Sequence, residues 1–216
     1  HLEIATLLGI TSGVVAVTKA DLLARPAWSD REVSIRAAIA ATGLREQPVV
    51  FCSSATGQGL DSLDRQLDDL LCRSPELPML PGFFLPVDRV FSAAGMGTVV
   101  TGTLLGAGLE SGAQAVVAPR GRSVIVRGLQ THGVDREYVE VGSRTAVNLR
   151  NVSRDDVRPG DVLCAPGCFP SSAQIDVRLT VSPTANRALK HLDEVRVMYG
   201  TRSATATVRL FLGNRI

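Results

Sequence analysis

Two short polar loops in the first third of the chain carry side chains that could recognise a purine base. The loop Thr18-Lys19-Ala20-Asp21 follows the apolar run Gly13–Val17, and the loop Ser53-Ser54-Ala55-Thr56-Gly57 follows the apolar run Pro48–Cys52. The Asp21 carboxylate can accept hydrogen bonds from both N–H groups on one edge of guanine, and a lysine stem can lie over a purine face. Backbone N–H groups of the second loop can donate to the guanine carbonyl, which adenine lacks. The pair therefore predicts a guanine site formed by Thr18, Lys19, Asp21, Ser53, Ser54 and Ala55.

The elements that would position these loops alternate between helix and strand over residues 1 to 77. Both apolar runs are short and continuous, as in strands that are buried on both faces. A helix is predicted before the first run, from Ile4, Leu7 and Leu8, and a second is predicted from Ser29, with Glu32 completing a capping box, to near Gly43. Leucines 60, 63, 67, 70 and 71 share one face of a third helix. This order predicts a parallel sheet with both loops at the carboxyl ends of its strands, where such sheets bind ligands.

A different pattern begins after Ser74-Pro75-Glu76-Leu77-Pro78, which is predicted to be an extended linker because proline interrupts helices. Short β-rich runs separated by glycines then predict a barrel or sandwich. A break at Pro166-Gly167 and Pro170 precedes a third β-rich unit, which is expected to be incomplete at residue 216. The predicted strands are 98–103, 113–118, 123–130, 144–149 and 161–164, followed by 175–181, 195–199 and 205–212.

Composition and missing motifs limit what the chain can do. Charged residues are 20% of the chain and the net charge is +2, so no strong overall field for RNA or membranes is expected. The four cysteines, at positions 52, 72, 164 and 168, are expected to be reduced, and no metal site is predicted. No apolar stretch reaches the length of a membrane span, and no signal peptide is recognised. The helical pattern at His1 lacks a cap, which suggests a cut end.

A phosphate-binding loop of the form Gly-x-x-x-x-Gly-Lys-Ser/Thr does not occur in the sequence. Phosphoryl transfer needs that cradle and its lysine for positioning and for charge neutralisation. We therefore expect no catalytic residues, no stably bound nucleotide and negligible GTP hydrolysis by this chain alone.

The two loops resemble the guanine-binding motifs of the GTPase superfamily. Thr18-Lys19-Ala20-Asp21 is similar to its asparagine-or-threonine, lysine, any residue, aspartate motif. Ser53-Ser54-Ala55 is similar to its serine–alanine loop, with Ser54 in place of the usual alanine. That departure is expected to matter little if the contact is made by the backbone. The resemblance implies that residues 1–77 are the C-terminal part of an α/β P-loop GTPase domain.

The middle of the chain resembles the second domain of Tu-type elongation factors. The similarity rests on Pro86–Phe91, on Gly95–Thr103 and on Gly108–Gly112. It implies an antiparallel β-barrel over residues 78–168 and part of a third-domain barrel over residues 169–216.

Three further segments resemble the selenocysteine-specific elongation factors, namely Val126–Gly133, Val141–Leu149 and Arg158–Leu163. The resemblance implies a cytoplasmic factor that binds GTP or GDP with Mg²⁺ and delivers selenocysteyl-tRNA to the ribosome. In this family, further domains absent here bind an mRNA element. The resemblance also implies a selenocysteine pocket at Asp88, Arg89 and Arg144. Fixed guanidinium charges would favour a selenolate over the neutral hydroxyl of serine, while Asp88 would hold one arginine in place.

Alternatives of two kinds remain at this point. Another GTPase of the same shape, such as a general elongation factor, an initiation factor gamma subunit or the GTPase subunit of ATP sulfurylase, would share both loops and the barrel. A non-enzymatic β-barrel binding module would use the α/β part only as a docking platform.

Overall fold

The computed structural model describes residues 1–73, 79–93, 97–182 and 185–211. The chain divides into two compact units, residues 1–76 and 77–216. The division into three domains, by contrast, stays a prediction. No helix among the described residues has both the length and the apolar character that a membrane crossing requires.

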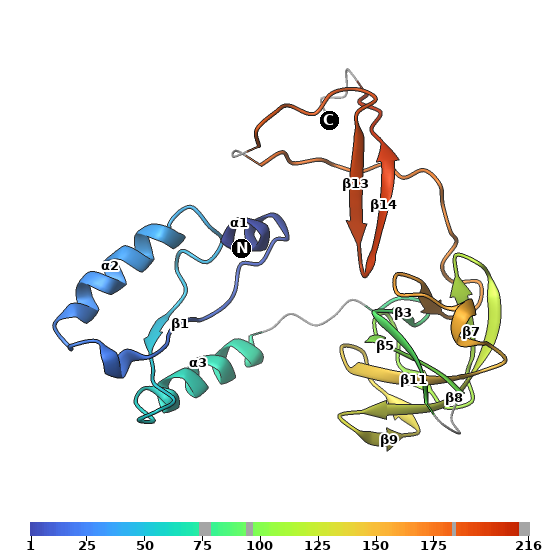
Figure 1. The fold of residues 1–216 in the computed structure, drawn as a ribbon, viewed down its shortest axis with the longest axis horizontal. Coiled ribbons are helices and arrows are strands. Elements are labelled where there is room, and N and C mark those ends of the chain that lie inside the picture. Colours follow the sequence, from blue (N-terminus) through green and yellow to red (C-terminus); the bar gives the residue numbers. More distant parts are fainter. Residues whose placement is uncertain (74–78, 94–96, 183–184, 212–216) are drawn as a thin grey trace. The chain divides into compact units, whose positions relative to one another are not determined.

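The first unit alternates helices and strands around a small parallel sheet (Figure 1). Strands β1 and β2 pair in parallel, with Val15 opposite Val49 and Val17 opposite Phe51. Its elements are α1 (Leu2–Leu7), β1 (Val15–Val17), the 3-10 turn η1 (Ala20–Leu22), α2 (Ala27–Ile39), β2 (Val49–Phe51) and α3 (Leu60–Cys72).

Two details of this unit differ from the sequence predictions. Helix α2 begins at Ala27, after Pro26, and no side chain caps it, so the predicted capping box at Ser29 is wrong. Pro26 has φ −60°, which already suits a helix start. Glu32 instead forms an ion pair with Arg36 one turn later, at 2.8 Å. Helix α2 ends at Ile39, several residues before Gly43.

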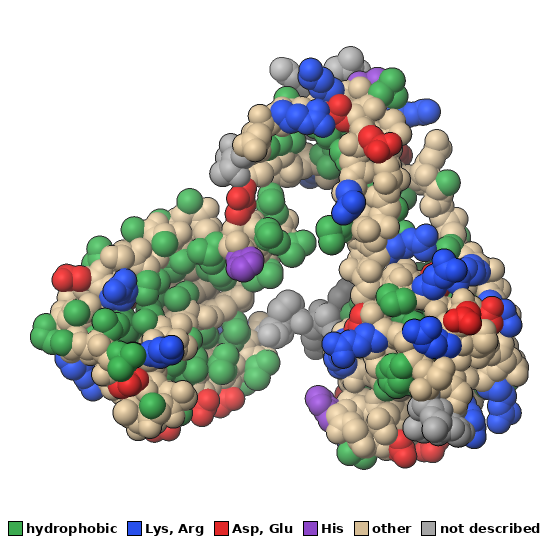
Figure 2. Space-filling view, viewed as in Figure 1, with side chains coloured by type: hydrophobic (Ala, Val, Ile, Leu, Met, Phe, Trp, Pro, Cys, Tyr) green, Lys and Arg blue, Asp and Glu red, His purple; other side chains and the backbone are tan. Residues whose placement is uncertain are grey.

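Strand β1 is also less buried than its apolar run predicts. Ala16 is exposed, whereas Val50, opposite it in β2, is buried. The described residues contribute only two strands to this sheet. Helix α1 likewise has no buried residue, and Figure 2 shows many hydrophobic side chains on the visible surface of this unit.

The second unit begins with an antiparallel barrel, as predicted. Its strands follow the order β3-β12-β7-β8-β11-β5-β4, and β9 pairs with the end of β8. The five predicted strands between residues 98 and 164 all form, with ends within two residues of those expected. The strands are β3 (Phe84–Pro86), β4 (Arg89–Ala93), β5 (Gly97–Thr103), β6 (Leu109–Glu110), β7 (Gln114–Ala118), β8 (Arg122–Thr131), β9 (Val134–Arg136), β10 (Tyr138–Val139), β11 (Arg144–Arg150) and β12 (Val162–Cys164), with the 3-10 turn η2 (Arg154–Asp156).

Alternating side chains fill the barrel. In β11 the side chains of Thr145, Val147 and Leu149 are buried, whereas Arg144 and Arg150 are exposed. Because strand side chains alternate between faces, this pattern directs the apolar set into one core. The core residues are Phe83, Leu85, Val87, Val100, Leu104, Leu109, Ala115, Val117, Val124, Val126, Leu129, Val139, Val147, Leu149, Val157 and Leu163.

A hairpin follows the barrel, made of β13 (Glu194–Tyr199) and β14 (Arg202–Thr207). The predicted strand over residues 175–181 is wrong, because no strand forms there and the apolar side chains of that segment are more than half exposed. Alternation alone cannot make a strand where no neighbour supplies backbone partners. Strand β14 begins at Arg202 and ends at Thr207, although residues 205 to 212 were predicted, and residue 212 lies outside the described residues.

Candidate functional sites

The two candidate guanine loops lie side by side at one edge of the sheet. The Cys52 N–H donates to the Val17 carbonyl at 2.9 Å, and the Ala20 N–H donates to the Cys52 carbonyl at 3.1 Å. These bonds continue the β1–β2 pairing past the ends of both strands. The parallel pairing therefore brings together two loops that are more than thirty residues apart in the sequence.

The first loop presents its charged side chains to solvent. Lys19 has φ +57°, in the left-handed region, and this sharp turn leads into the 3-10 turn that contains Asp21. Ala20 is buried and anchors the loop, whereas Thr18, Lys19 and Asp21 are exposed. Among the described residues, no ion pair occupies the Asp21 carboxylate. This carboxylate is thus free of the buried salt bridge that would exclude a base-binding role.

The second loop is organised around the buried side chain of Ser53. The Ser53 Oγ accepts the Ala55 N–H at 3.2 Å and the Thr56 N–H at 3.4 Å. Its own N–H donates to the Gln58 carbonyl at 2.8 Å, and its carbonyl accepts the Gly57 N–H at 3.0 Å. Ser54 and Ala55 are exposed at the tip of the loop. Ser53 therefore shapes the loop from inside, while its neighbours face outward.

Three residues that the sequence analysis did not single out support this edge. The Trp28 ring stacks on Phe51 with centroids 4.5 Å apart and planes within 8°, and the Arg25 guanidinium lies 4.7 Å from the Trp28 centroid. Gly59 has φ +73°, and a Cβ placed there would lie 2.0 Å from the Phe51 carbonyl oxygen. The signals available in the sequence were its only tryptophan and the Gly-x-Gly spacing at 57 and 59.

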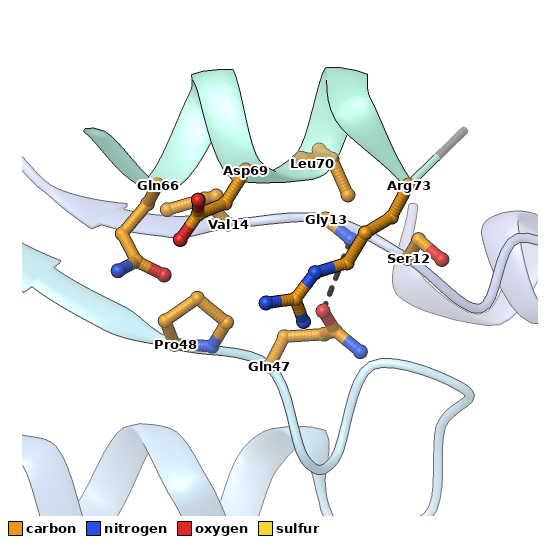
Figure 3. A pocket seen from close by; sticks show the side chains of 9 residues that line it. All are labelled: Ser12, Gly13, Val14, Gln47, Pro48, Gln66, Asp69, Leu70 and Arg73. Carbon is orange, nitrogen blue, oxygen red and sulfur yellow. Dashed lines mark hydrogen bonds between the residues drawn. The ribbon is translucent and has the colours of Figure 1, made fainter. Parts of the chain in front are cut away.

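A pocket of about 230 Å³ in this unit lies away from the two loops. Gly13 and Val14 line it just before β1, and Pro48 lines it just before β2. The remaining walls come from Ser12, Gln47, the second half of α3 and Arg73 directly after it (Figure 3). It therefore opens at the amino ends of the strands, whereas ligands of parallel sheets bind at the carboxyl ends. The pocket is therefore separate from the two candidate guanine loops.

The barrel joins two of the three residues predicted for an aminoacyl pocket. The Arg144 guanidinium donates to the Asp88 carboxylate through both Nη atoms, at 2.5 and 3.0 Å. Thr101 Oγ1 donates to the same carboxylate at 2.7 Å. Bidentate pairs of this kind fix the plane of the guanidinium as well as its position. Asp88 therefore orients Arg144, which is still about half exposed.

Arg89 lies beside this pair on the outer face of the barrel. It stands opposite Thr101 in the β4–β5 pairing, and its side chain is exposed. The hydrogen bond from Arg144 lowers the pKa of the Asp88 carboxyl from its ordinary 3.8, with smaller contributions from Thr101 and from the charges of Arg144 and Arg89, while burial opposes them. Two arginines against one carboxylate leave this surface with excess positive charge, which suits an anionic ligand.

The described residues contain no cluster of three or more histidine, cysteine, aspartate or glutamate side chains placed to hold a metal ion. The Cys164 thiol is buried, and this burial raises its pKa, so it is a poor nucleophile and a poor ligand.

Comparison with known proteins gives one consistent result. The chain is 37% identical over 215 residues to a selenocysteine-specific elongation factor from Desulfomicrobium baculatum, covering 100% of this chain and 34% of the relative. It is 32% identical over 193 residues to elongation factor Tu 2 from Streptomyces avermitilis, covering 85% of this chain and 50% of that one. The chain thus spans between a third and a half of the length of these two relatives. No family model matches it.

Solved structures agree with the sequence matches. A bacterial selenocysteine-specific elongation factor, EF-Sec, superposes with a TM-score of 0.83 at 26% identity, covering 97% of this chain and 35% of that one. The elongation factor SelB from Methanococcus maripaludis, solved with the GTP analogue GppNHp, shares the fold with a TM-score of 0.82 at 22% identity, covering 96% and 46%.

Fold and similarity together define the class, because the chain combines an α/β unit built on a parallel sheet with a Tu-type barrel and aligns with elongation factors. It belongs to the translational GTPase superfamily. Within that superfamily it is recognised as a relative of the selenocysteine-specific elongation factors, with which it aligns over its whole length.

Proposed function

We propose that this chain is a segment of a selenocysteine-specific translation elongation factor, which binds GTP and delivers selenocysteyl-tRNA to the ribosome in the cytoplasm. Residues 1–77 would be the C-terminal part of its GTP-binding domain, 78–168 its second-domain barrel and 169–216 part of its third domain. GTP or GDP with Mg²⁺, the ribosome and an mRNA element would be ligands of the complete factor. The observation that carries the nucleotide part is the backbone bond from Ala20 to Cys52, which joins the two loops.

The guanine base would bind over the edge formed by these loops. Asp21 would accept both N–H groups of the base, and the Lys19 stem would cover one of its faces. Backbone N–H groups at Ser54 and Ala55 would meet the guanine carbonyl, and Thr18 would brace the first loop. Because Ser53 Oγ accepts the Ala55 N–H at 3.2 Å, the base would share that donor with the serine.

The test replaces the Asp21 carboxylate of the complete factor with an amide and measures nucleotide affinity. Asp21→Asn should weaken GDP binding by about a hundredfold, because a charge-assisted bidentate contact contributes about 3 kcal/mol. It should also strengthen binding of xanthosine diphosphate, whose base carries a carbonyl where guanine has an amine. Asp68→Asn, at an exposed position of α3, is the matched control and should bind GDP normally. Unchanged GDP affinity in Asp21→Asn would rule out the base contact.

The selenocysteine side chain would bind beside Arg144 and Arg89. A selenol is ionised near neutral pH and serine is not, so fixed guanidinium charges favour the selenolate. The two hydrogen bonds from Arg144 to Asp88 support this assignment, because they hold one cation in a fixed orientation at an exposed surface. Asp88 would hold Arg144 in place, and both arginines would face the anion.

The corresponding test measures selectivity in the complete factor. Arg144→Ala should reduce the preference for selenocysteyl-tRNA over seryl-tRNA by about tenfold or more, since a hydrogen bond to a charged group contributes about 1.5–3 kcal/mol. Arg150→Ala removes another exposed arginine from the same strand and should leave the ratio unchanged. Equal ratios for Arg144→Ala and the wild type would show that the pocket lies elsewhere. A general elongation factor is the alternative that such a result would favour.

A further inference from the structure

The turn of the β13–β14 hairpin contacts the barrel immediately before Asp88. Thr201 Oγ1 donates to the Val87 carbonyl at 2.7 Å. Arg202 Nη1 lies 3.8 Å from Asp161 Oδ1, and a Cβ placed on Gly200 would lie 3.3 Å from the Pro86 Cβ. The hairpin turn therefore makes a hydrogen bond to Val87 and an ion pair with Asp161, and its Gly200 lies close to Pro86.

The same stretch is held from its other side by the turn that precedes β12. The Val87 N–H donates to the Asp161 carbonyl at 2.9 Å, and the Gly160 N–H donates to the Val87 carbonyl at 2.8 Å. The Val87 carbonyl thus accepts one bond from within the barrel and a second from Thr201. Val87 itself is fully buried, so its backbone lies between the core and the hairpin turn.

Asp161 extends this contact to a buried charge. Its carboxylate is almost completely buried and accepts the Arg158 N–H at 2.9 Å and Arg120 Nη1 at 3.2 Å. Arg202 brings a second cation to the same group. Since a buried carboxylate is costly unless it is paired and hydrogen-bonded, these contacts stabilise one position of the turn that holds Val87.

Val87 and Asp88 lie between two strands, and this explains why such contacts matter. The β3–β12 pairing ends at Pro86, and the β4–β5 pairing begins at Arg89. The two residues between them depend on individual hydrogen bonds for their backbone direction. That direction sets where the Asp88 carboxylate meets Arg144 and Thr101, because Asp88 is the next residue along the chain.

We propose that Thr201 and Arg202, at the hairpin turn, are positioning residues for the Asp88–Arg144 pair on the barrel. Among the described residues, neither of them forms a hydrogen bond or an ion pair with Asp88 or Arg144. They act through the Val87 carbonyl and through Asp161, and they fix the backbone from which Asp88 projects. The importance of the pair for selenocysteine rests on the function proposed above, whereas the positioning itself does not.

The test uses NMR on the 216-residue chain and needs no tRNA. Thr201→Val removes the hydroxyl and keeps the shape, and Arg202→Gln removes the charge. Thr205→Val and Arg196→Gln, at exposed positions of the same hairpin, are the matched controls. The readouts are the titration midpoint of the Asp88 carboxyl carbon, which senses Arg144, Arg89 and Thr101, and hydrogen exchange at the Val87 and Asp88 amides. Arg144→Gln defines the midpoint of the separated pair.

Both hairpin variants should move the Asp88 midpoint upward, to a value between those of the wild type and Arg144→Gln. They should also accelerate exchange at the two amides by about fivefold, which corresponds to loss of one hydrogen bond of about 1 kcal/mol. The controls should match the wild type. If Thr201→Val and Arg202→Gln both keep the wild-type Asp88 midpoint and the wild-type exchange rates, the proposal is overturned. This holds also where the substitution releases the hairpin from an intact barrel, because the Asp88–Arg144 pair would then be positioned without the hairpin.

This readout separates two possible failures. If Arg144→Ala leaves tRNA selection unchanged but Thr201→Val still shifts the Asp88 titration, the selenocysteine pocket is wrong and the positioning role stands. If tRNA selection depends on Arg144 but the hairpin variants leave the Asp88 midpoint unchanged, the pocket assignment is supported and the positioning role is wrong.

Discussion

Gly57 and Gly59 test how the second candidate guanine loop is built and how it joins α3. Both have positive φ, +76° and +73°; Gly57 ends the loop, and Gly59 precedes the first residue of α3. A Cβ on Gly57 would meet no atom within 4 Å, whereas a Cβ on Gly59 would lie 2.0 Å from the Phe51 carbonyl oxygen. Replacing each with alanine therefore imposes the same backbone penalty and differs only in steric overlap.

The expected magnitudes follow from that difference. A left-handed conformation costs a non-glycine residue about 1 kcal/mol. Gly57→Ala should thus destabilise the first unit by about 1 kcal/mol. Gly59→Ala adds an overlap with backbone, for which overpacking costs of about 1–3 kcal/mol are typical, so its total should be about 3 kcal/mol. At a urea dependence of about 1.5 kcal/mol per molar, the unfolding midpoints should fall by about 0.7 M and about 2 M.

Tryptophan fluorescence is the suitable assay, because the single tryptophan of the chain stacks on Phe51, the residue whose carbonyl the new methyl group would strike. The signal therefore reports unfolding of the first unit and not of the barrel. Equal midpoints for the two alanine variants would refute the close approach of Gly59 to Phe51. A larger loss for Gly57→Ala would refute the described loop conformation altogether.

Two further predictions concern the barrel. Because the pKa of Asp88 is lowered in the folded state, its contribution to stability is present above the unfolded pKa of about 3.8 and is lost as pH falls through the lower folded value. Urea unfolding of the wild type and of Asp88→Asn can be followed by amide NMR of the barrel. The difference between their unfolding midpoints should be constant from pH 7 to about 5 and should shrink below about pH 4. A difference that grows on acidification would contradict the ion pair. Gly102→Ala should destabilise the barrel by about 2 kcal/mol, because the new Cβ would lie 2.3 Å from the Pro86 carbonyl oxygen. Gly128→Ala is the control: its Cβ would meet no atom within 4 Å, so the same urea titration should show almost no loss of stability. Similar losses in both variants would contradict the tight approach of β5 to β3.

Local pattern predicted most of the secondary structure, and the exceptions have physical causes. The leucine spacing of α3 and the glycine-bounded runs of the barrel specify their elements directly, because each run finds its partners within the chain. The run at 175–181 has the same alternation but no described strand beside it, so it remains unpaired. The capping box at Ser29 failed because Pro26 starts α2 earlier and places Ser29 inside the helix.

The residue types of both candidate sites were determined by the sequence alone, since a carboxylate after an apolar run and arginines in glycine-bounded β-rich runs can be recognised without coordinates. Only the tertiary structure decided which of them meet. The bonds from Ala20 to Cys52, from Arg144 to Asp88 and from Thr201 to Val87 join residues separated by 32, 56 and 114 positions. No local pattern encodes such contacts, because they depend on strand register and on how the chain closes on itself.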